Sequence, residues 1–259
     1  ISKCCLNMKL NVLVTGANGF FGKAMIGRLK KSNVNILTFT RENNSQDLQA
    51  LVLRSDFIYH FAGEVKAGLS SIKYERSNSA LTQNILDILE SKNKNTPILF
   101  TSSIHSDVSV SSYGKTKKKS EEMIEKYANR KSTRCYIYKL PHVFGQECKP
   151  NHNSVITTWM YNSINHIDID VYDKEIKMNY IYIQDIVGEF AELLTVTRDT
   201  LYLKPQLIYP TTLGDVLEYI EEFKVNVNKT DYVIVDNEFK SKLYATYQSY
   251  FSDIKNEPT

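Results

Sequence analysis

Three residues in the middle of the chain, Ser103, Tyr113 and Lys117, have the types and spacing of an acid–base site. Tyr113 and Lys117 are four residues apart, so on a helix they share a face. A tyrosine with a pKa near ~10 is a poor acid at neutral pH, but a neighbouring ammonium lowers that pKa. Ser103 would hold a substrate oxygen while Tyr113 gives or takes its proton and a hydride moves. The pair alone also fits a helix with a core tyrosine, so its context must decide.

That context begins with three glycines, Gly16, Gly19 and Gly22, which follow an apolar run at residues 10–14. We expect Gly16 to make a tight turn, Gly19 to admit a pyrophosphate, and Gly22 to let the following helix pack close to the sheet. The N–H groups at the start of that helix would face the phosphates. A strand-to-helix turn without a ligand is the alternative for a glycine trio on its own.

The first hundred residues alternate between strand and helix patterns, which predicts a doubly wound, Rossmann-type parallel α/β sheet. Ligands bind at the carboxyl ends of the strands in such sheets. The glycine turn, Arg41, Ala62, Gly63 and Ser103 all lie at predicted strand ends and can line one cleft. The expected strands are residues 10–14, 34–39, 56–63, 97–103 and 135–140, and the expected helices include residues 21–31, 72–89 and 113–128.

The second half of the chain predicts a small carboxy-terminal lobe that binds substrate. We expect a helix at residues 155–164, a strand at 167–172, and a helix that begins at a capping box, Thr212 to Asp215. The predicted domains are an NADP-binding core at residues 8–145 with 179–197 returning to it, a lobe at 146–178 and 198–245, and a tail or linker at 246–259.

The residue after the second strand indicates which dinucleotide binds. NAD enzymes use an acidic residue here for the ribose 2′-hydroxyl, whereas this chain has Thr40 and Arg41, which suit a 2′-phosphate. We therefore predict NADPH, with an ordinary surface arginine as the alternative. His60, in the next predicted strand, is interpreted as a packing residue under the cofactor.

Composition excludes several other classes of protein. The net charge of +3 is too small to indicate nucleic acid, and no apolar run approaches the ~20 residues of a membrane helix. The four cysteines have no metal-ligand spacing with the histidines, and Cys4 and Cys5 are neighbours, which favours a reducing compartment. We expect a cytoplasmic protein without a metal.

The whole chain resembles the sugar-nucleotide group of the extended short-chain dehydrogenase/reductase superfamily. Residues 144–156 and the short loop from Ser103 to Tyr113 are similar to the reductase of capsular polysaccharide synthesis in the N-acetyl-L-fucosamine pathway. His142 replaces that family's asparagine, and Lys149 its arginine. The motifs that carry the broader resemblance are residues 15–22, 60–63, 102–103, 113–117 and 179–185.

The resemblance implies that NADPH reduces the C4 keto group of a UDP-4-keto-6-deoxy-N-acetyl-hexosamine to a UDP-2-acetamido-2,6-dideoxy-talose. Enzymes of that family also carry a zinc-containing cupin epimerase domain. This chain stops near the linker to such a domain, so the cupin would be a separate partner. The implied cofactor contacts are Gly16, Asn18, Gly19, Phe20, Phe21, Gly22, Arg41, Ala62, Gly63, Ser102, Tyr113, Lys117 and Pro141. The implied substrate contacts are Ser103, His142, Lys149, Asn151, Asn153, Ser154 and Asn179.

Two other functions stay open on the sequence. A 4-epimerase or 4,6-dehydratase would retain NAD, and a dehydratase needs acidic groups beside the active hydroxyl, where Ile104 and His105 stand. A dinucleotide-sensing regulator would have no need of Ser103, Tyr113 and Lys117 together. Helices that flank the site could pair two copies of the chain in a homodimer.

Overall fold

The computed structural model describes residues 9–66, 68–108, 110–152, 154–226 and 237–256, with side chains up to residue 252. Cys4, Cys5, Met8 and Asn153 lie outside these residues, as does part of the predicted lobe. The chain divides into two compact units. The first contains residues 1–64, 68–139 and 187–204, and the second contains residues 65–67, 140–186 and 205–259.

The first unit is built on a six-stranded parallel sheet with the order β2-β1-β3-β4-β5-β8. The order reverses between β1 and β3, which is where ligands bind in doubly wound sheets. The predicted α/β fold is confirmed. The strands are β1 (Leu10–Thr15), β2 (Val34–Phe39), β3 (Phe57–His60), β4 (Ile98–Ser103), β5 (Cys135–Leu140) and β8 (Tyr202–Leu203).

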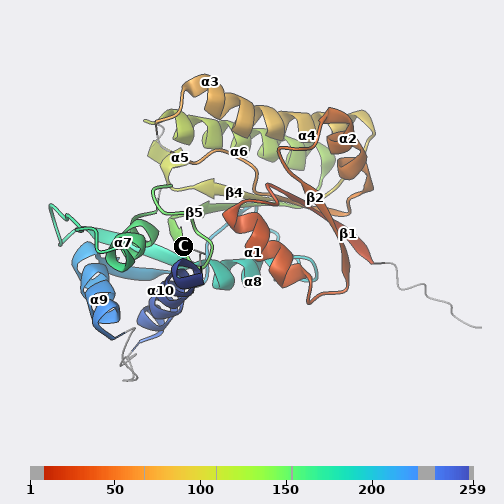
Figure 1. The fold of residues 1–259 in the computed structure, drawn as a ribbon. Helices are drawn as coiled ribbons and strands as arrows, with labels where there is room; N and C mark the ends of the chain where they lie inside the picture. Colours follow the sequence, from red (N-terminus) through yellow and green to blue (C-terminus); the bar gives the residue numbers. More distant parts are fainter. Residues whose placement is uncertain (1–8, 67, 109, 153, 227–236, 257–259) are drawn as a thin grey trace, which may run out of the picture. The chain divides into compact units, whose positions relative to one another are not determined.

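Two apolar layers cover this sheet (Figure 1). Helices α2 (Ser45–Arg54), α4 (Ala80–Ser91) and α6 (Ser112–Lys131) lie on one side, and α1 (Phe20–Leu29) lies on the other. On the first side, aliphatic residues such as Leu13, Val52 and Ile85 pack into one buried cluster. On the α1 side the packing is largely aromatic, since the Phe61 ring contacts that of Phe21 and stacks on that of Phe190.

The predicted helix at residues 72–89 is divided into three segments: α3 (Ser71–Tyr74), a π-helical turn η1 (Glu75–Ser79), and α4. Single π turns within helices are often found at functional sites. A short helix, α5 (His105–Val108), also precedes α6. Helix α5 lies between Ser103 and Tyr113 in the sequence, and α3 and η1 contact α6 in the folded chain.

The second unit contains a three-stranded sheet with the order β6-β7-β9. Helices α7 and α9 and a carboxy-terminal helix, α10, pack through the buried Phe144, Ile220, Leu243 and Tyr247. The capping box at Thr212 is present, because Thr212 and Asp215 each accept a hydrogen bond from the other's backbone N–H. The elements are β6 (His142–Phe144), β7 (Lys177–Tyr182), β9 (Tyr209–Thr212), α7 (Val155–Ile164), α8 (Ile183–Glu192), α9 (Leu213–Asn226) and α10 (Glu238–Asn256).

The units differ from the predicted domains in three places. Residues 177–182 pair with β6 and β9 rather than with the large sheet. The strand that returns to the large sheet is β8, which pairs with β5. The strand predicted at residues 167–172 is wrong, because this segment pairs with neither sheet and is a loop. Residues 246–250 belong to α10, where Tyr247 is 1% exposed, rather than to a tail.

Within the described residues, we find no helix with the length and apolarity to cross a membrane.

Candidate active site

The glycine turn after β1 lies against two neighbouring strand ends. The N–H of Gly16 donates to the Phe39 carbonyl at the end of β2 over 2.9 Å. Gly16 has φ +68°, and a Cβ there would lie 2.8 Å from the backbone nitrogen of Ala62. A side chain at this position would be both strained and in collision with the backbone. The turn therefore brings Ala62, a predicted cofactor contact, directly under the loop.

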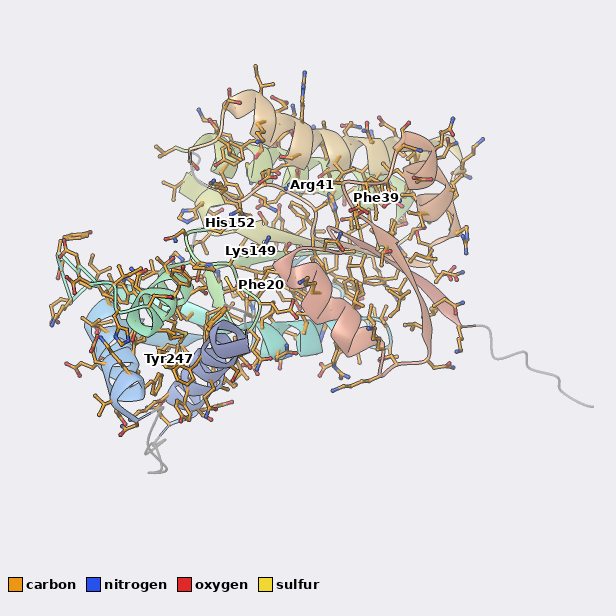
Figure 2. All side chains as sticks on the ribbon, viewed as in Figure 1. Phe20, Phe39, Arg41, Lys149, His152 and Tyr247 are labelled. Carbon is orange, nitrogen blue, oxygen red and sulfur yellow. The ribbon has the colours of Figure 1, made fainter. Side chains whose placement is uncertain are left out.

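Helix α1 begins at Phe20, and its N-cap residue, Gly19, provides no side-chain hydrogen bond to the first turn. The N–H groups of a first helical turn have no partner within the helix, so this end can receive an anion. A Cβ on Gly22 would lie 2.2 Å from the Gly16 carbonyl oxygen and 2.7 Å from Cα of Ala17. Gly22 thus lets α1 pack on the glycine loop itself, whereas we expected contact with the sheet. Asn18 is exposed and Phe20 is half-buried at the start of α1 (Figure 2).

Arg41 follows β2, as predicted, and its guanidinium forms an ion pair with Glu64, beyond β3 (Figure 2). The Arg41 side chain is 85% exposed, whereas that of Glu64 is only 12% exposed. An exposed ion pair contributes little to stability, so Arg41 can exchange partners at small cost. The carboxylate of Glu64 is an acidic group at this strand end that the sequence did not indicate.

Ser103, Tyr113 and Lys117 are brought together. The Tyr113 side chain hydrogen-bonds with that of Ser103 at the end of β4. The Lys117 ammonium lies 5.9 Å from the centroid of the Tyr113 ring, and it donates to the Thr101 carbonyl over 2.8 Å. Lys117 is buried in the face of α6 that packs on β4. A hydroxyl pair beside a buried ammonium can hold and protonate a carbonyl oxygen.

The expected effect of Lys117 on Tyr113 is wrong for this state of the protein. Burial raises the pKa of Tyr113 to about 12, although the hydrogen bond with Ser103 acts to lower it. The ammonium points at Thr101 rather than at the phenol oxygen, so burial dominates. Tyr113 is accordingly a neutral phenol that can donate a proton.

Ser102 and Gly63 flank this centre. The Ser102 hydroxyl donates to the buried carboxylate of Glu121, which directs it into α6. A Cβ on Gly63 would lie 2.9 Å from Oδ1 of Asn78 and 3.8 Å from the Lys117 ammonium. The close approach to Asn78 is what disfavours a side chain at residue 63, since 3.8 Å is an ordinary contact distance.

His60 is fully satisfied by hydrogen bonds and is more than a packing residue. Its Nδ1 lies 2.8 Å from the Thr15 hydroxyl, and its Nε2 lies 2.9 Å from the Thr82 hydroxyl. The Thr15 hydroxyl also accepts from the N–H of Ala62. Burial and the charge of Lys117 lower the pKa of His60 to about 3. The neutral ring therefore ties the glycine loop to α4.

Acid should destabilise the protein through His60. Its folded pKa of about 3 lies below the unfolded value near ~6.5, so its stabilising effect is complete above pH ~6.5 and is lost as the pH falls toward 3. This one group removes about 1.4 kcal/mol per pH unit across that window. We expect His60→Gln to flatten the fall in unfolding free energy, measured by urea denaturation between pH 6 and 4. The exposed His166, which has φ +57°, offers His166→Asn as a control that keeps the wild-type slope. An unchanged slope in His60→Gln would contradict the assignment.

The predicted substrate contacts of the second unit lie on one loop and two strands. Lys149, Asn151 and Asn179 are exposed. The loop before α7, where Lys149 and His152 lie (Figure 2), is held by Tyr250, whose hydroxyl donates to the carbonyls of Gly145 and Cys148. Ser154 is the N-cap of α7 and accepts from the Thr157 N–H, so its hydroxyl has a structural role. His142, on β6, lies beside the ring of Tyr180, which is on β7. Pro141 joins β5 to β6.

Among the described residues, no group of histidine, cysteine, aspartate and glutamate could hold a metal ion.

Residues 12–199 match the NAD dependent epimerase/dehydratase family. The chain belongs to this family. A curated relative, the UDP-2-acetamido-2,6-beta-L-arabino-hexul-4-ose reductase of Pseudomonas aeruginosa, is 31% identical over 248 residues. That match covers 94% of this chain and 66% of the relative, so the chain spans slightly less than two thirds of its length.

The solved structures show the same relationship. The capsular polysaccharide assembling protein CapF from Staphylococcus aureus has a TM-score of 0.82 at 30% identity, over 96% of this chain and 67% of CapF. A UDP-glucose 4-epimerase from Thermotoga maritima has a TM-score of 0.81 at 14% identity, over 95% of this chain and 100% of its own. The second likeness shows the fold alone.

Three residues that connect the parts of this site, Glu64, Asn78 and Glu121, were missed by the sequence analysis. The Asn78 amide, in η1, forms hydrogen bonds with the backbone of Glu64 and the hydroxyl of Thr116, so it joins the segment after β3 to α6. Only Glu121 had a local signal, because it lies four residues after Lys117 on a predicted helix. Glu64 and Asn78 act across long sequence separations, where no periodicity could identify them.

Proposed function

We propose that this chain is an NADPH-dependent 4-ketoreductase acting on a UDP-4-keto-6-deoxy-N-acetyl-hexosamine in capsule or O-antigen polysaccharide biosynthesis. The observation that carries the proposal is the hydrogen-bonded pair of Ser103 and Tyr113 beside the buried Lys117. The relative from Pseudomonas aeruginosa, named as a hexul-4-ose reductase, supports the substrate class.

The chain's own residues would act as follows. A bound nicotinamide supplies the hydride for the C4 carbon. Ser103 donates a hydrogen bond to the keto oxygen, and Tyr113 transfers its phenolic proton to that oxygen as negative charge develops. Lys117 holds the nicotinamide ribose and stabilises the phenolate that remains. The first turn of α1 receives the pyrophosphate.

The sugar nucleotide would be held by the second unit through His142, Lys149, Asn151, Asn153, Ser154 and Asn179. Lys149 can meet a phosphate as a point charge, whereas an arginine would form a fork. A homodimer and a separate cupin epimerase remain predicted partners, and a cytoplasmic location remains predicted.

A 4-epimerase or dehydratase that retains NAD is the second candidate, and Glu64 is the observation that favours it. A carboxylate near the end of β2 can accept from the ribose hydroxyls of NAD. Against a dehydratase, the nearest acidic residue after Ser103 is Asp107, which is already paired with Lys139. A sensing regulator is the least supported, because it needs no buried lysine beside a tyrosine.

The decisive experiment gives the purified protein a UDP-4-keto-6-deoxy-N-acetyl-hexosamine with NADPH or NADH and follows the loss of reduced-cofactor absorbance. Stoichiometric oxidation supports the reductase. An isomerised or dehydrated sugar without net oxidation would establish the second candidate. Absence of both reactions would contradict every catalytic proposal.

Arg41 sets the expected cofactor preference. Arg41→Ala should weaken NADPH binding roughly tenfold and leave NADH binding within about twofold, since a charge-assisted hydrogen bond contributes about 1.5–3 kcal/mol and exposure reduces it. Glu64→Gln removes the competing carboxylate, so it should tighten NADPH binding instead. Fluorescence titration of both cofactors measures this. Equal losses for NADPH and NADH in Arg41→Ala would contradict a contact with the 2′-phosphate.

A further inference from the structure

Helix α6 contains a carboxylate, Glu121, that is completely buried one turn beyond Lys117. Its Oε1 accepts the hydrogen bond from Ser102. Its Oε2 has no hydrogen-bond partner among the described residues, but it lies 3.4 Å from the ammonium of Lys139 and 3.6 Å from that of Lys118. Burying a carboxylate with an unsatisfied oxygen costs stability. The presence of Glu121 at this position therefore needs an explanation.

Lys117 needs a negative charge that its direct contacts do not supply. It is 4% exposed, and its ammonium touches the Thr101 carbonyl and the face of the Phe100 ring, 4.6 Å away. Both are weak substitutes for water. Burial lowers the pKa of Lys117 to about 8, and the charge of Glu121 opposes that fall. Without Glu121, Lys117 would be neutral over more of the physiological range.

We propose that Glu121 is a positioning residue that keeps Lys117 charged and orients Ser102, and so prepares the neighbouring Ser103, Tyr113 and Lys117 for proton transfer. This inference rests on the proposed reductase function. The Glu121 oxygens are directed at Ser102, Lys118 and Lys139. Glu121 therefore acts through other residues and would not touch the substrate.

The other charged groups around Glu121 and Lys117 determine whether a substitution raises or lowers the pKa of Lys117. On the far side of Glu121, Lys139 on β5 also pairs with Asp107 on α5, so charges alternate toward the surface. Lys139 partly neutralises Glu121, and its removal should strengthen the pull of Glu121 on Lys117. The groups that face Lys117 or its neighbours are neutral His60 on β3, Tyr74 on α3, Tyr113, Lys118 and Glu121 on α6, Lys139 on β5 and Asp107 on α5.

The test is Glu121→Gln, which keeps an acceptor for Ser102 and removes the charge. In the profile of kcat/KM against pH, the alkaline limb should move to lower pH by about one unit or more, because an opposite charge nearby shifts a pKa by about 1–3 units. Rescue is expected from Glu121→Asp, which restores the charge at least in part. Glu122→Gln, the same change at the next, exposed position of α6, should leave the limb in place.

Lys139→Gln provides a second measurement of opposite sign, in case Glu121→Gln does not fold. In Lys139→Gln the alkaline limb of the kcat/KM profile should move to higher pH, because Glu121 would then attract Lys117 more strongly. The Lys117 titration can also be followed without substrate, by the ¹³Cε resonance of labelled lysine assigned with Lys117→Met, so a failed reductase assay does not affect it. A folded Glu121→Gln with the wild-type Lys117 titration would overturn the inference, as would a downward shift in Lys139→Gln.

Discussion

Tyr113→Phe is expected to lower kcat by about 10²- to 10⁴-fold, the usual contribution of a positioned general acid. Phenylalanine keeps the ring that packs against Tyr74, 6.0 Å away between centroids, and loses only the hydroxyl bonded with Ser103. The keto oxygen would then have no acid at hand as the hydride arrives. Because the substitution leaves the other implied cofactor contacts, such as the glycine turn and Arg41, unchanged, NADPH should bind with nearly wild-type affinity.

Tyr127→Phe is the matched control, since it removes the same atom from the same helix. The Tyr127 hydroxyl donates to the carbonyls of Lys94 and Thr96, away from the proposed chemistry. Its loss should cost about 1 kcal/mol of stability and leave kcat unchanged. Single-turnover oxidation of NADPH and thermal unfolding of both variants make the comparison. Wild-type kcat in Tyr113→Phe would eliminate Tyr113 as the acid.

The largest expected effect on stability and cofactor binding is that of Gly22→Ala. A methyl group there would lie 2.2 Å from the Gly16 carbonyl oxygen and within 3 Å of the Ala17 backbone. Backbone atoms cannot rotate away as a side chain can, so α1 and the glycine loop must separate. We expect a loss of about 1–3 kcal/mol in unfolding free energy, as for other overpacked sites. The first turn of α1 would also be displaced, so NADPH binding should fall by more than tenfold.

Gly27→Ala on the same helix should have the opposite effect. A Cβ at residue 27 would meet nothing within 4 Å, and alanine is the better helix former. Stability should rise by about 0.4–1 kcal/mol with NADPH binding unchanged. Urea denaturation and fluorescence titration test the two variants together. Equal stability of the two would show that the loop can open to accept a side chain.

Much of the proposed chemistry can be predicted from the sequence, because it depends on local patterns. The spacing of Tyr113 and Lys117 puts both on one face of a helix, and Ser103 ends a buried strand whatever surrounds it. The glycine trio likewise determines a turn between a strand and a helix. Alternating strands and helices then require a parallel sheet, which brings the strand ends to one edge.

Other features depend on pairings between residues far apart in the chain, which periodicity does not encode. The sequence pattern assigns residues 179–197 to the large sheet, whereas the partners of β7, which are β6 and β9, place it in the small sheet. In the same way, α10 became recognisable as a helix of the second unit through the buried Tyr247 and Leu243.

The proposed reacting groups, and the order in which they occur along the strands and helices, can be identified from local sequence patterns. Their electrostatic surroundings depend on the folded chain. Burial raises the pKa of Tyr113 and lowers that of Lys117, and the carboxylates of Glu64 and Glu121 meet Arg41 and the lysines only in the folded chain. The physical reason is that desolvation and charge–charge interactions depend on distance in space, whereas the patterns that form helices and strands depend on distance along the chain.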